Sequence, residues 1–189
     1  PCEENCQRHT VMGEETISIQ LLERTCAAEK EKKERRTFEL DPLPQKAAVV
    51  GAGPAGLACA LYLSRKRYGV TVFEREPGWG GSLAGHEKFG IFEEEFKKKF
   101  DMTDGNEGSV IWKFGQEITS LDQLEGFDLI FIATGAGGND FGLLDGFDQK
   151  LGTTKNPKVF LGGELGGLSK TEGMARTLDT SKAMESWLQ

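Results

Sequence analysis

The 189-residue chain lacks long apolar runs and any excess of positive charge. No stretch approaches the ~20 apolar residues that a membrane-spanning helix needs, and no signal peptide is visible. Acidic residues outnumber basic ones by 30 to 23, which gives a formal net charge of −7 and no basic surface for nucleic-acid phosphates. We therefore expect a cytoplasmic, globular protein that binds neither membranes nor nucleic acids.

Cysteine is scarce as well, with four residues: Cys2, Cys6, Cys26 and Cys59. Cys59 falls in an apolar helical pattern and is expected in the core. Cys2 and Cys6 stand in a polar segment, but two thiols cannot complete a four-thiolate cluster, so we expect no metal site in this chain taken alone. Free thiols fit a reducing cytoplasm. No pairing of a nucleophile with a base stands out either, so no catalytic residue is predicted.

The first 44 residues have the pattern of an arm that precedes the main domain. Apolar residues recur at helical spacing after Thr16, and mixed charges continue the helical pattern to about Arg36. The segment Asp41-Pro42-Leu43-Pro44 is a stiff linker, because each proline disfavours helix at the residue before it. We therefore predict a helical arm over residues 1–44 and a main domain over residues 45–189.

The main domain alternates apolar strand patterns with helical ones. The predicted strands are 46–51, 70–74, 110–114, 128–133 and 158–161, and the predicted helices are 54–66, 92–100 and 171–188, with a helical turn at 121–124. In the second helix, Phe92, Phe96 and Phe100 recur at the spacing of one helix face. Such alternation implies an α/β fold with a parallel sheet covered on both faces.

A glycine fingerprint follows the first predicted strand. Gly51 allows a tight turn off the strand, Gly53 allows the backbone to approach a pyrophosphate, and Gly56 allows the helix to pack close to the sheet. The N-terminus of the following helix offers free N–H groups and the positive end of its dipole to phosphates. Glu74, 23 residues after Gly51, lies where an acid accepts hydrogen bonds from a ribose diol. The sequence therefore predicts a dinucleotide site.

Several further motifs occur in a fixed order along the chain. They are Pro1-Cys2-Glu3-Glu4-Asn5-Cys6, Ile17-Ser18-Ile19 to Leu22-Glu23-Arg24, Val49-Val50-Gly51-Ala52-Gly53-Pro54-Ala55-Gly56-Leu57, Val70-Thr71-Val72-Phe73-Glu74 with Gly80-Gly81, and Phe131-Ile132-Ala133-Thr134-Gly135-Ala136. Together they resemble the small (beta) subunit of bacterial glutamate synthase and its relatives, which include the NADPH-side subunit of ferredoxin:NADP transhydrogenase. The resemblance covers nearly the whole chain. It implies a Rossmann-like FAD-binding domain of the glutathione-reductase type, preceded by a short helical N-terminal arm that is a remnant of an iron–sulfur domain.

The resemblance also implies that the cofactor is FAD. The implied FAD contacts lie in the fingerprint, after the second strand, in the Gly-Gly loop, after the Ala-Thr-Gly strand, in a late Gly-Gly-acid motif and at the start of the last helix. They are Gly51, Gly53, Pro54, Ala55, Gly56, Glu74, Arg75, Gly80, Gly81, Ser82, Leu83, Ala133, Thr134, Gly135, Gly163, Glu164, Gly173 and Met174. Backbone N–H groups of residues 172–175 are expected to face the pyrimidine edge of the flavin, where a donor stabilises the reduced ring.

The chain departs from the family pattern in two ways. Glu164 stands where the family carries an aspartate, so the carboxylate that would accept a ribityl hydrogen bond is one methylene longer. Only about twenty residues, Gly137 to Pro157, occupy the place where relatives insert a whole NAD(P)H-binding domain, and a domain cannot fit in that length. Electrons are therefore expected to come from a protein partner or from domains outside this chain, on the iron–sulfur or the NAD(P)H side.

Three functions fit the sequence. The first is an FAD-binding oxidoreductase module for electron transfer, which is not self-sufficient with NAD(P)H. The second is a non-catalytic FAD- or nucleotide-binding scaffold within a larger complex. The third is an NAD(H)-dependent dehydrogenase, which is disfavoured because neither a substrate domain nor an acid–base pair is visible.

Overall fold

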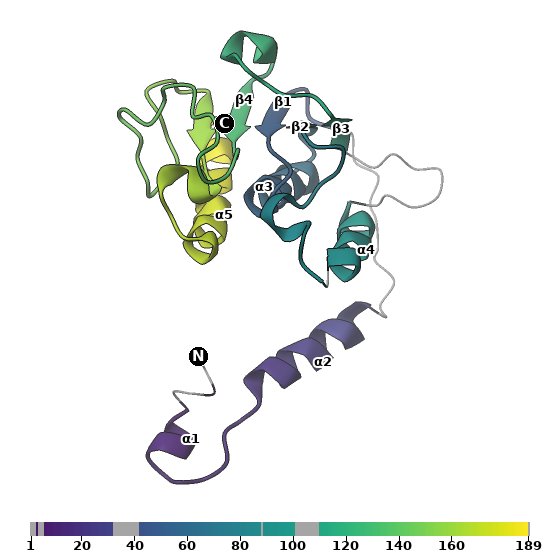
Figure 1. The fold of residues 1–189 in the computed structure, drawn as a ribbon, viewed down its shortest axis with the longest axis vertical. Helices are drawn as coiled ribbons and strands as arrows, with labels where there is room; N and C mark the ends of the chain where they lie inside the picture. Colours follow the sequence, from purple (N-terminus) through teal and green to yellow (C-terminus); the bar gives the residue numbers. More distant parts are fainter. Residues whose placement is uncertain (1–2, 4–5, 32–41, 88, 101–109, 189) are drawn as a thin grey trace. The chain divides into compact units, whose positions relative to one another are not determined.

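The structure is a computed structural model that describes residues 3, 6–31, 42–87, 89–100 and 110–188 (Figure 1). The chain divides into two compact units, Pro1–Glu39 and Leu40–Gln189. Each unit is described by itself below.

The described part of the first unit contains two helices, α1 (Gln7–Thr10) and α2 (Ile19–Glu31). α1 was not predicted, because four residues are too few to show a helical period. α2 begins three residues after the predicted start at Thr16, and the predicted end at Arg36 lies outside the described residues. The expected apolar face of this helix is not buried within the unit, since Leu21 and Leu22 are more than half exposed.

The second unit is built on a five-stranded parallel sheet, as the sequence predicts. The strands are β1 (Lys46–Val50), β2 (Gly69–Glu74), β3 (Val110–Phe114), β4 (Leu129–Ile132) and β5 (Val159–Leu161). Their order across the sheet is β3-β2-β1-β4-β5, and all four pairings are parallel. The central strands are nearly continuous apolar runs that are buried on both faces, which is why they form the middle of a parallel sheet. The α/β, Rossmann-like fold class is thereby confirmed.

The two faces of the sheet are covered by different kinds of structure. On one face, α3 (Pro54–Arg65) and α5 (Lys170–Trp187) bury side chains such as Leu57 and Met184 against the strands. The other face is covered by the 3-10 helix Leu121–Leu124 and by loops that carry Phe127 and Phe147. The predicted covering of both faces is therefore correct, although within the described residues α-helices cover one face only.

The helix α4 (Phe89–Lys99) starts three residues earlier than predicted, and only part of the predicted apolar face packs inward. Phe100 is buried and stacks on Trp79, with ring centroids 6.3 Å apart, and Phe96 packs on the same indole. Phe92 is 39% exposed, so the prediction that it shares the buried face is wrong. Phe89 takes its place against the core, because the earlier start of the helix places it beside the Gly80 turn.

The segment between β4 and β5 contains turns and one isolated bridge, from Thr153 to Phe160. Side chains within it are held locally: the Asp148 carboxylate accepts from the Lys150 amide at 2.7 Å. Phe147 in this segment packs against the loop-covered face of the sheet. The segment thus connects two neighbouring strands and adds a cover to the sheet, and no helix or strand lies within it.

Candidate functional site

A cavity of about 900 Å³ opens at the carboxyl ends of the parallel strands. Its walls come from the segments that follow each of the five strands, together with the start of α3 and part of α5. This edge is where open α/β sheets bind ligands, and the volume lies near the upper end of the roughly 300–1,000 Å³ of cofactor sites. The position of the cavity therefore defines it as the candidate functional site.

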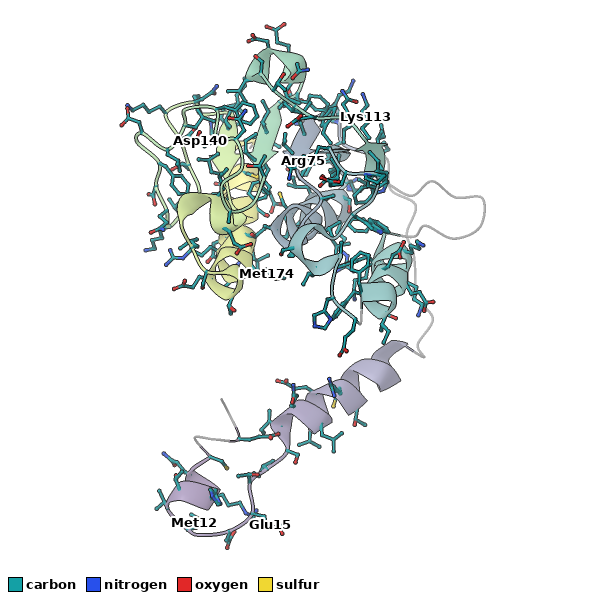
Figure 2. The ribbon with its side chains drawn as sticks, in the orientation of Figure 1. Met12, Glu15, Arg75, Lys113, Asp140 and Met174 are labelled. Carbon is teal, nitrogen blue, oxygen red and sulfur yellow. The ribbon has the colours of Figure 1, made fainter. Side chains whose placement is uncertain are left out.

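Most of the predicted contacts meet in this one cavity. Fifteen of the eighteen line it: Gly51, Gly53, Pro54, Ala55, Glu74, Arg75, Gly81, Ser82, Leu83, Ala133, Thr134, Gly135, Gly163, Glu164 and Met174. Arg75 follows β2, whereas Met174 lies on α5 (Figure 2), so the cavity joins residues 99 positions apart in the chain. Chain folding brings the two motif groups together, as binding of one dinucleotide requires.

Gly56, Gly80 and Gly173 do not line the cavity, and the structure gives each of them a packing role. A Cβ on Gly56 would overlap the carbonyl oxygen of Gly51, and a Cβ on Gly80 would overlap the ring of Phe89. A Cβ on Gly173 would lie 2.8 Å from the carbonyl carbon of Gly163. These glycines allow close approach of backbone and rings behind the cavity wall, so their prediction as direct contacts is not supported by their position.

Gly51 and Gly53 differ in what requires them to be glycine. Gly51 has φ +104°, and a Cβ there would overlap the carbonyl oxygen of Ala133, so the fold itself demands glycine. Gly53 has φ −76° and ψ −178°, which any residue adopts, and the nearest heavy atom to a Cβ there is the Gly81 Cα at 3.9 Å. Because Gly53 lines the cavity, the space beside it belongs to the cavity. Nothing in the fold requires glycine at this position.

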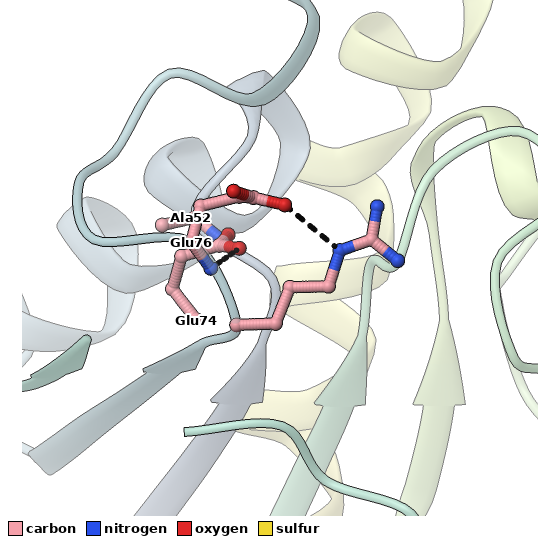
Figure 3. A network of polar contacts seen from close by, with 4 residues as sticks. Ala52, Glu74 and Glu76 are labelled. Carbon is pink, nitrogen blue, oxygen red and sulfur yellow. Dashed lines mark hydrogen bonds and ion pairs between the residues drawn. The ribbon is translucent and has the colours of Figure 1, made fainter. Parts of the chain in front are cut away.

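Glu74 organises the loops at one end of the cavity. Its side chain is 9% exposed, and one carboxylate oxygen accepts the Ala52 amide at 2.6 Å (Figure 3). The other oxygen accepts the Glu76 amide at 3.0 Å. A carboxylate offers about four lone-pair sites, so two remain for a ribose diol. The residue predicted to bind ribose therefore also ties the glycine loop to the end of β2, which the sequence did not indicate.

The residues Gln116, Glu117 and Ile118 line the same end of the cavity and were not predicted. The Gln116 amide donates to the Glu74 carbonyl at 2.9 Å, and this bond holds the segment beside the end of β2. The segment follows β3, which pairs with β2 in parallel. The pairing of β3 with β2 would have identified this segment, because the carboxyl ends of neighbouring parallel strands lie at the same edge of the sheet.

The start of α5 is held by a capping box. Ser169 caps the helix: its hydroxyl accepts from the Glu172 amide, and the Glu172 carboxylate accepts from the Ser169 amide in return. The Gly173 amide donates to the Ser169 carbonyl at 2.8 Å. The N–H groups of Glu172 and Gly173 therefore already have acceptors within the helix. The expectation that the amides of residues 172–175 face a flavin ring stays a prediction. Met174 lines the cavity and is 49% exposed.

The charge around the cavity is mostly negative. Four carboxylates line it, those of Glu74, Glu76, Glu117 and Glu164, whereas the one cationic side chain among the described lining residues is that of Arg75. The Arg75 Nε lies 3.4 Å from a Glu76 oxygen, so this cation already has an anionic partner. A phosphate bound here would therefore depend on backbone N–H groups and on the dipole of α3 rather than on side-chain cations.

Two side chains near the cavity contribute to the core. Trp79 is 7% exposed and packs among aromatic rings, with its centroid 4.9 Å from that of Trp112, and it also forms part of the cavity wall. Cys59 is fully buried, and burial raises its pKa to about 12. Over the described ranges, no three histidine, cysteine or acidic side chains gather as a metal site would require. In the same ranges no helix combines the length and apolarity needed to cross a membrane.

Comparison with known proteins agrees with the geometry. Residues 49–114 match the NAD(P)-binding Rossmann-like domain family. The chain is 33% identical over 144 residues to the NADPH-Fe(3+) oxidoreductase subunit beta of Geobacter sulfurreducens, an alignment that covers 72% of this chain and 21% of that protein. It is 31% identical over 162 residues to the glutamate synthase [NADPH] small chain of Bacillus subtilis, which covers 79% of this chain and 31% of that protein.

Among solved structures, histamine dehydrogenase from Rhizobium sp. 4-9 is 31% identical, with a TM-score of 0.41 over 55% of this chain and 16% of that one. A TM-score this low does not establish a common fold over the whole chain, so the relationship rests on the sequence relatives. The chain spans less than a third of the length of the curated relatives described above.

The sheet order, the glycine turn and the cavity define a Rossmann-like dinucleotide-binding domain. Within that class, the chain is homologous to the glutamate synthase small chain and to beta subunits of related oxidoreductases. The family resemblance inferred from the motifs is thereby confirmed.

Proposed function

We propose that this chain binds FAD in the cavity and serves as the flavin-binding part of an electron-transfer oxidoreductase. The observation that carries the proposal is Gly53, which lines the cavity although its backbone conformation suits any residue and a Cβ there would meet no heavy atom closer than 3.9 Å. A glycine that the fold does not require is explained by a ligand that approaches the backbone closely, as a pyrophosphate does. One relative is named an oxidoreductase subunit and the other an NADPH-linked glutamate synthase chain, which supports a redox role.

The residues that line the cavity include groups suited to the different parts of FAD. The first turn of α3, with the Ala55 amide, would hold the pyrophosphate, because N–H groups there have no acceptor within the helix. Glu74 would accept from the adenosine ribose, and Glu164 would accept from the ribityl chain near Gly163. FAD would supply reversible uptake of one or two electrons. The protein would bind and orient it, with Met174 at the wall formed by α5.

The electron donor and acceptor lie outside this chain in the proposal. The segment 137–157 contains turns rather than a second nucleotide-binding unit, and the relatives extend well beyond the length that this chain matches. We assign residues 1–44 to a remnant of an iron–sulfur domain and residues 45–189 to the FAD-binding domain. The free thiols of Cys6, Cys26 and Cys59 fit a reducing cytoplasm.

Purification of the chain tests the cofactor. We expect a yellow protein that releases FAD on heating, at about one FAD per chain, with FAD identified by chromatography. Release of FMN or NAD, or a colourless protein that does not take up added FAD, would overturn the proposal.

Stopped-flow mixing tests the electron source. We expect dithionite to reduce the flavin fully and NADPH to reduce it only slowly, because hydride transfer needs nicotinamide held about 3–3.5 Å from the flavin. Saturable reduction by NADPH at tens per second would show that this chain contains its own nicotinamide site.

A further inference from the structure

We infer that Phe89 and Trp79 position the turn at Gly80 and Gly81 against the glycine fingerprint, so that docking of α4 and binding of FAD favour each other. The inference rests on the proposed function, because it takes the space beside Gly53 as the place of the pyrophosphate. It gives α4 a role in cofactor binding, although none of its residues 89–99 lines the cavity.

The turn at Gly80 and Gly81 touches the glycine fingerprint directly. The Gly80 amide donates to the Ala52 carbonyl at 2.9 Å. Gly81 has φ +52°, and a Cβ there would lie 2.9 Å from the Gly53 Cα. Gly53 and Gly81 both line the cavity, so they form adjoining parts of one wall. A small shift of this turn would therefore change the space that the pyrophosphate is proposed to occupy.

Phe89, the first residue of α4, packs on the same turn. A Cβ on Gly80 would overlap the Phe89 ring, so the ring lies directly against the turn backbone. Gly80 itself does not line the cavity, which places this contact behind the wall. The Leu83 amide donates to the Gly80 carbonyl at 2.9 Å, and the Phe89 amide donates to the His86 carbonyl at 2.8 Å. Packing and hydrogen bonds thus connect the start of α4 to the cavity wall.

Trp79, which precedes the turn and lines the cavity, is the second attachment point of α4. Its ring centroid lies 6.3 Å from that of Phe96 and 6.3 Å from that of Phe100, the residue that follows the helix. Elsewhere on α4, Ile91 is 65% exposed, and none of residues 89–99 is fully buried. Elements with few buried contacts open at low free-energy cost. Docking of α4 is therefore open to influence from a ligand that needs the turn in place.

A coupling of this kind acts in both directions. If FAD binds more tightly when the turn is held in place, FAD must stabilise the docked position of α4 by the same free energy. Phe89 is thus a positioning residue that acts through the turn, without contact with FAD.

Two variants of the same helix test the effect on affinity. Phe89→Ala removes the ring on the turn, whereas the control Phe92→Ala removes a ring that is 39% exposed. We expect Phe89→Ala to bind FAD roughly tenfold more weakly, as for a usual coupling between sites. Phe92→Ala should stay within about twofold of the parent, as most surface substitutions do. Phe89→Met should recover part of the affinity, because methionine fills irregular apolar space.

These titrations of FAD-free protein are made well below the melting temperature of each variant, so that global unfolding does not contribute. Hydrogen exchange on the same samples measures the coupling itself. In the parent and in Phe92→Ala, added FAD should slow exchange of the amides of residues 93–99, and in Phe89→Ala it should not. A purely structural role of Phe89 would lower the melting temperature without removing this response to FAD.

Equal FAD affinities of Phe89→Ala and Phe92→Ala, or exchange in α4 of the parent that FAD leaves unchanged, would overturn the inference while the FAD assignment holds. A parent protein that does not bind FAD would overturn the proposed function and this inference with it, so the two failures are distinguishable.

Discussion

Replacing Gly53 by alanine separates what the cofactor requires from what the fold requires. The backbone at Gly53 (φ −76°, ψ −178°) suits alanine, and the added Cβ would lie 3.9 Å from the nearest heavy atom, the Gly81 Cα. Alanine also restricts the unfolded chain, which stabilises a protein by about 0.4–1 kcal/mol where the native backbone is compatible. We therefore expect the FAD-free protein to melt at the same temperature as the parent or up to ~4 °C higher.

FAD binding should respond in the opposite direction. The new methyl group would occupy the cavity beside the backbone where the pyrophosphate is proposed to approach. Loss of one charge-assisted hydrogen bond costs about 1.5–3 kcal/mol, which corresponds to roughly 10- to 150-fold weaker binding. The bulkier Gly53→Val variant should lose more. Fluorescence titration of the FAD-free protein measures both affinities, and thermal unfolding of the same samples measures stability.

Gly51→Ala provides the matched contrast. Gly51 has φ +104°, and its Cβ would overlap the Ala133 carbonyl oxygen, so this variant should lower the melting temperature before any ligand is added. Two results would refute the reasoning. One is a Gly53→Ala protein that binds FAD within twofold of the parent. The other is a Gly53→Ala protein that is destabilised as much as Gly51→Ala.

Three further predictions concern single side chains. Glu74→Gln should weaken FAD binding. It should also destabilise the FAD-free protein by about 1–3 kcal/mol and lower its melting temperature, because both carboxylate oxygens accept backbone amides. An unchanged melting temperature would show that these hydrogen bonds do not support the loop. The Tyr62 hydroxyl and then the Lys66 ammonium lower the pKa of Glu185, so the stability from this carboxylate is present above its unfolded pKa and is lost as pH falls through the folded value. Melting curves from pH 6 to pH 3 should therefore show a steeper loss in the parent than in Glu185→Gln, and parallel curves would contradict this assignment. Iodoacetamide at pH 8 should label exposed Cys26 and spare buried Cys59, whose pKa is raised to about 12. Mass spectrometry of the native protein measures the two labelling rates. Equal rates would contradict the burial of Cys59 in the core.

The elements of the main domain were predictable because each one has a local cause. The apolar runs of β1, β2 and β4 are buried on both faces, so they appear in the sequence as uninterrupted hydrophobic segments. The glycine turn and Pro54 mark the start of α3, since proline suits the first position of a helix. Element starts were less certain where no such signal exists, and α4 begins three residues before its predicted position.

The sequence by itself determined the strands and the glycine turn, because backbone requirements and apolar runs are local properties, and the family resemblance of its motifs implied fifteen residues that line the cavity. Only the tertiary structure showed which of those residues the fold requires and which ones only line the cavity. Gly53 lacks a structural need for glycine while Gly51 has one, and this difference depends on contacts with residues about thirty and eighty positions away. Likewise, Glu74 holds two loops because the carboxylate meets amides from different segments, and Glu117 joins it because β3 pairs with β2. Contacts between distant parts of the chain have no local pattern, so they became visible only in the folded protein.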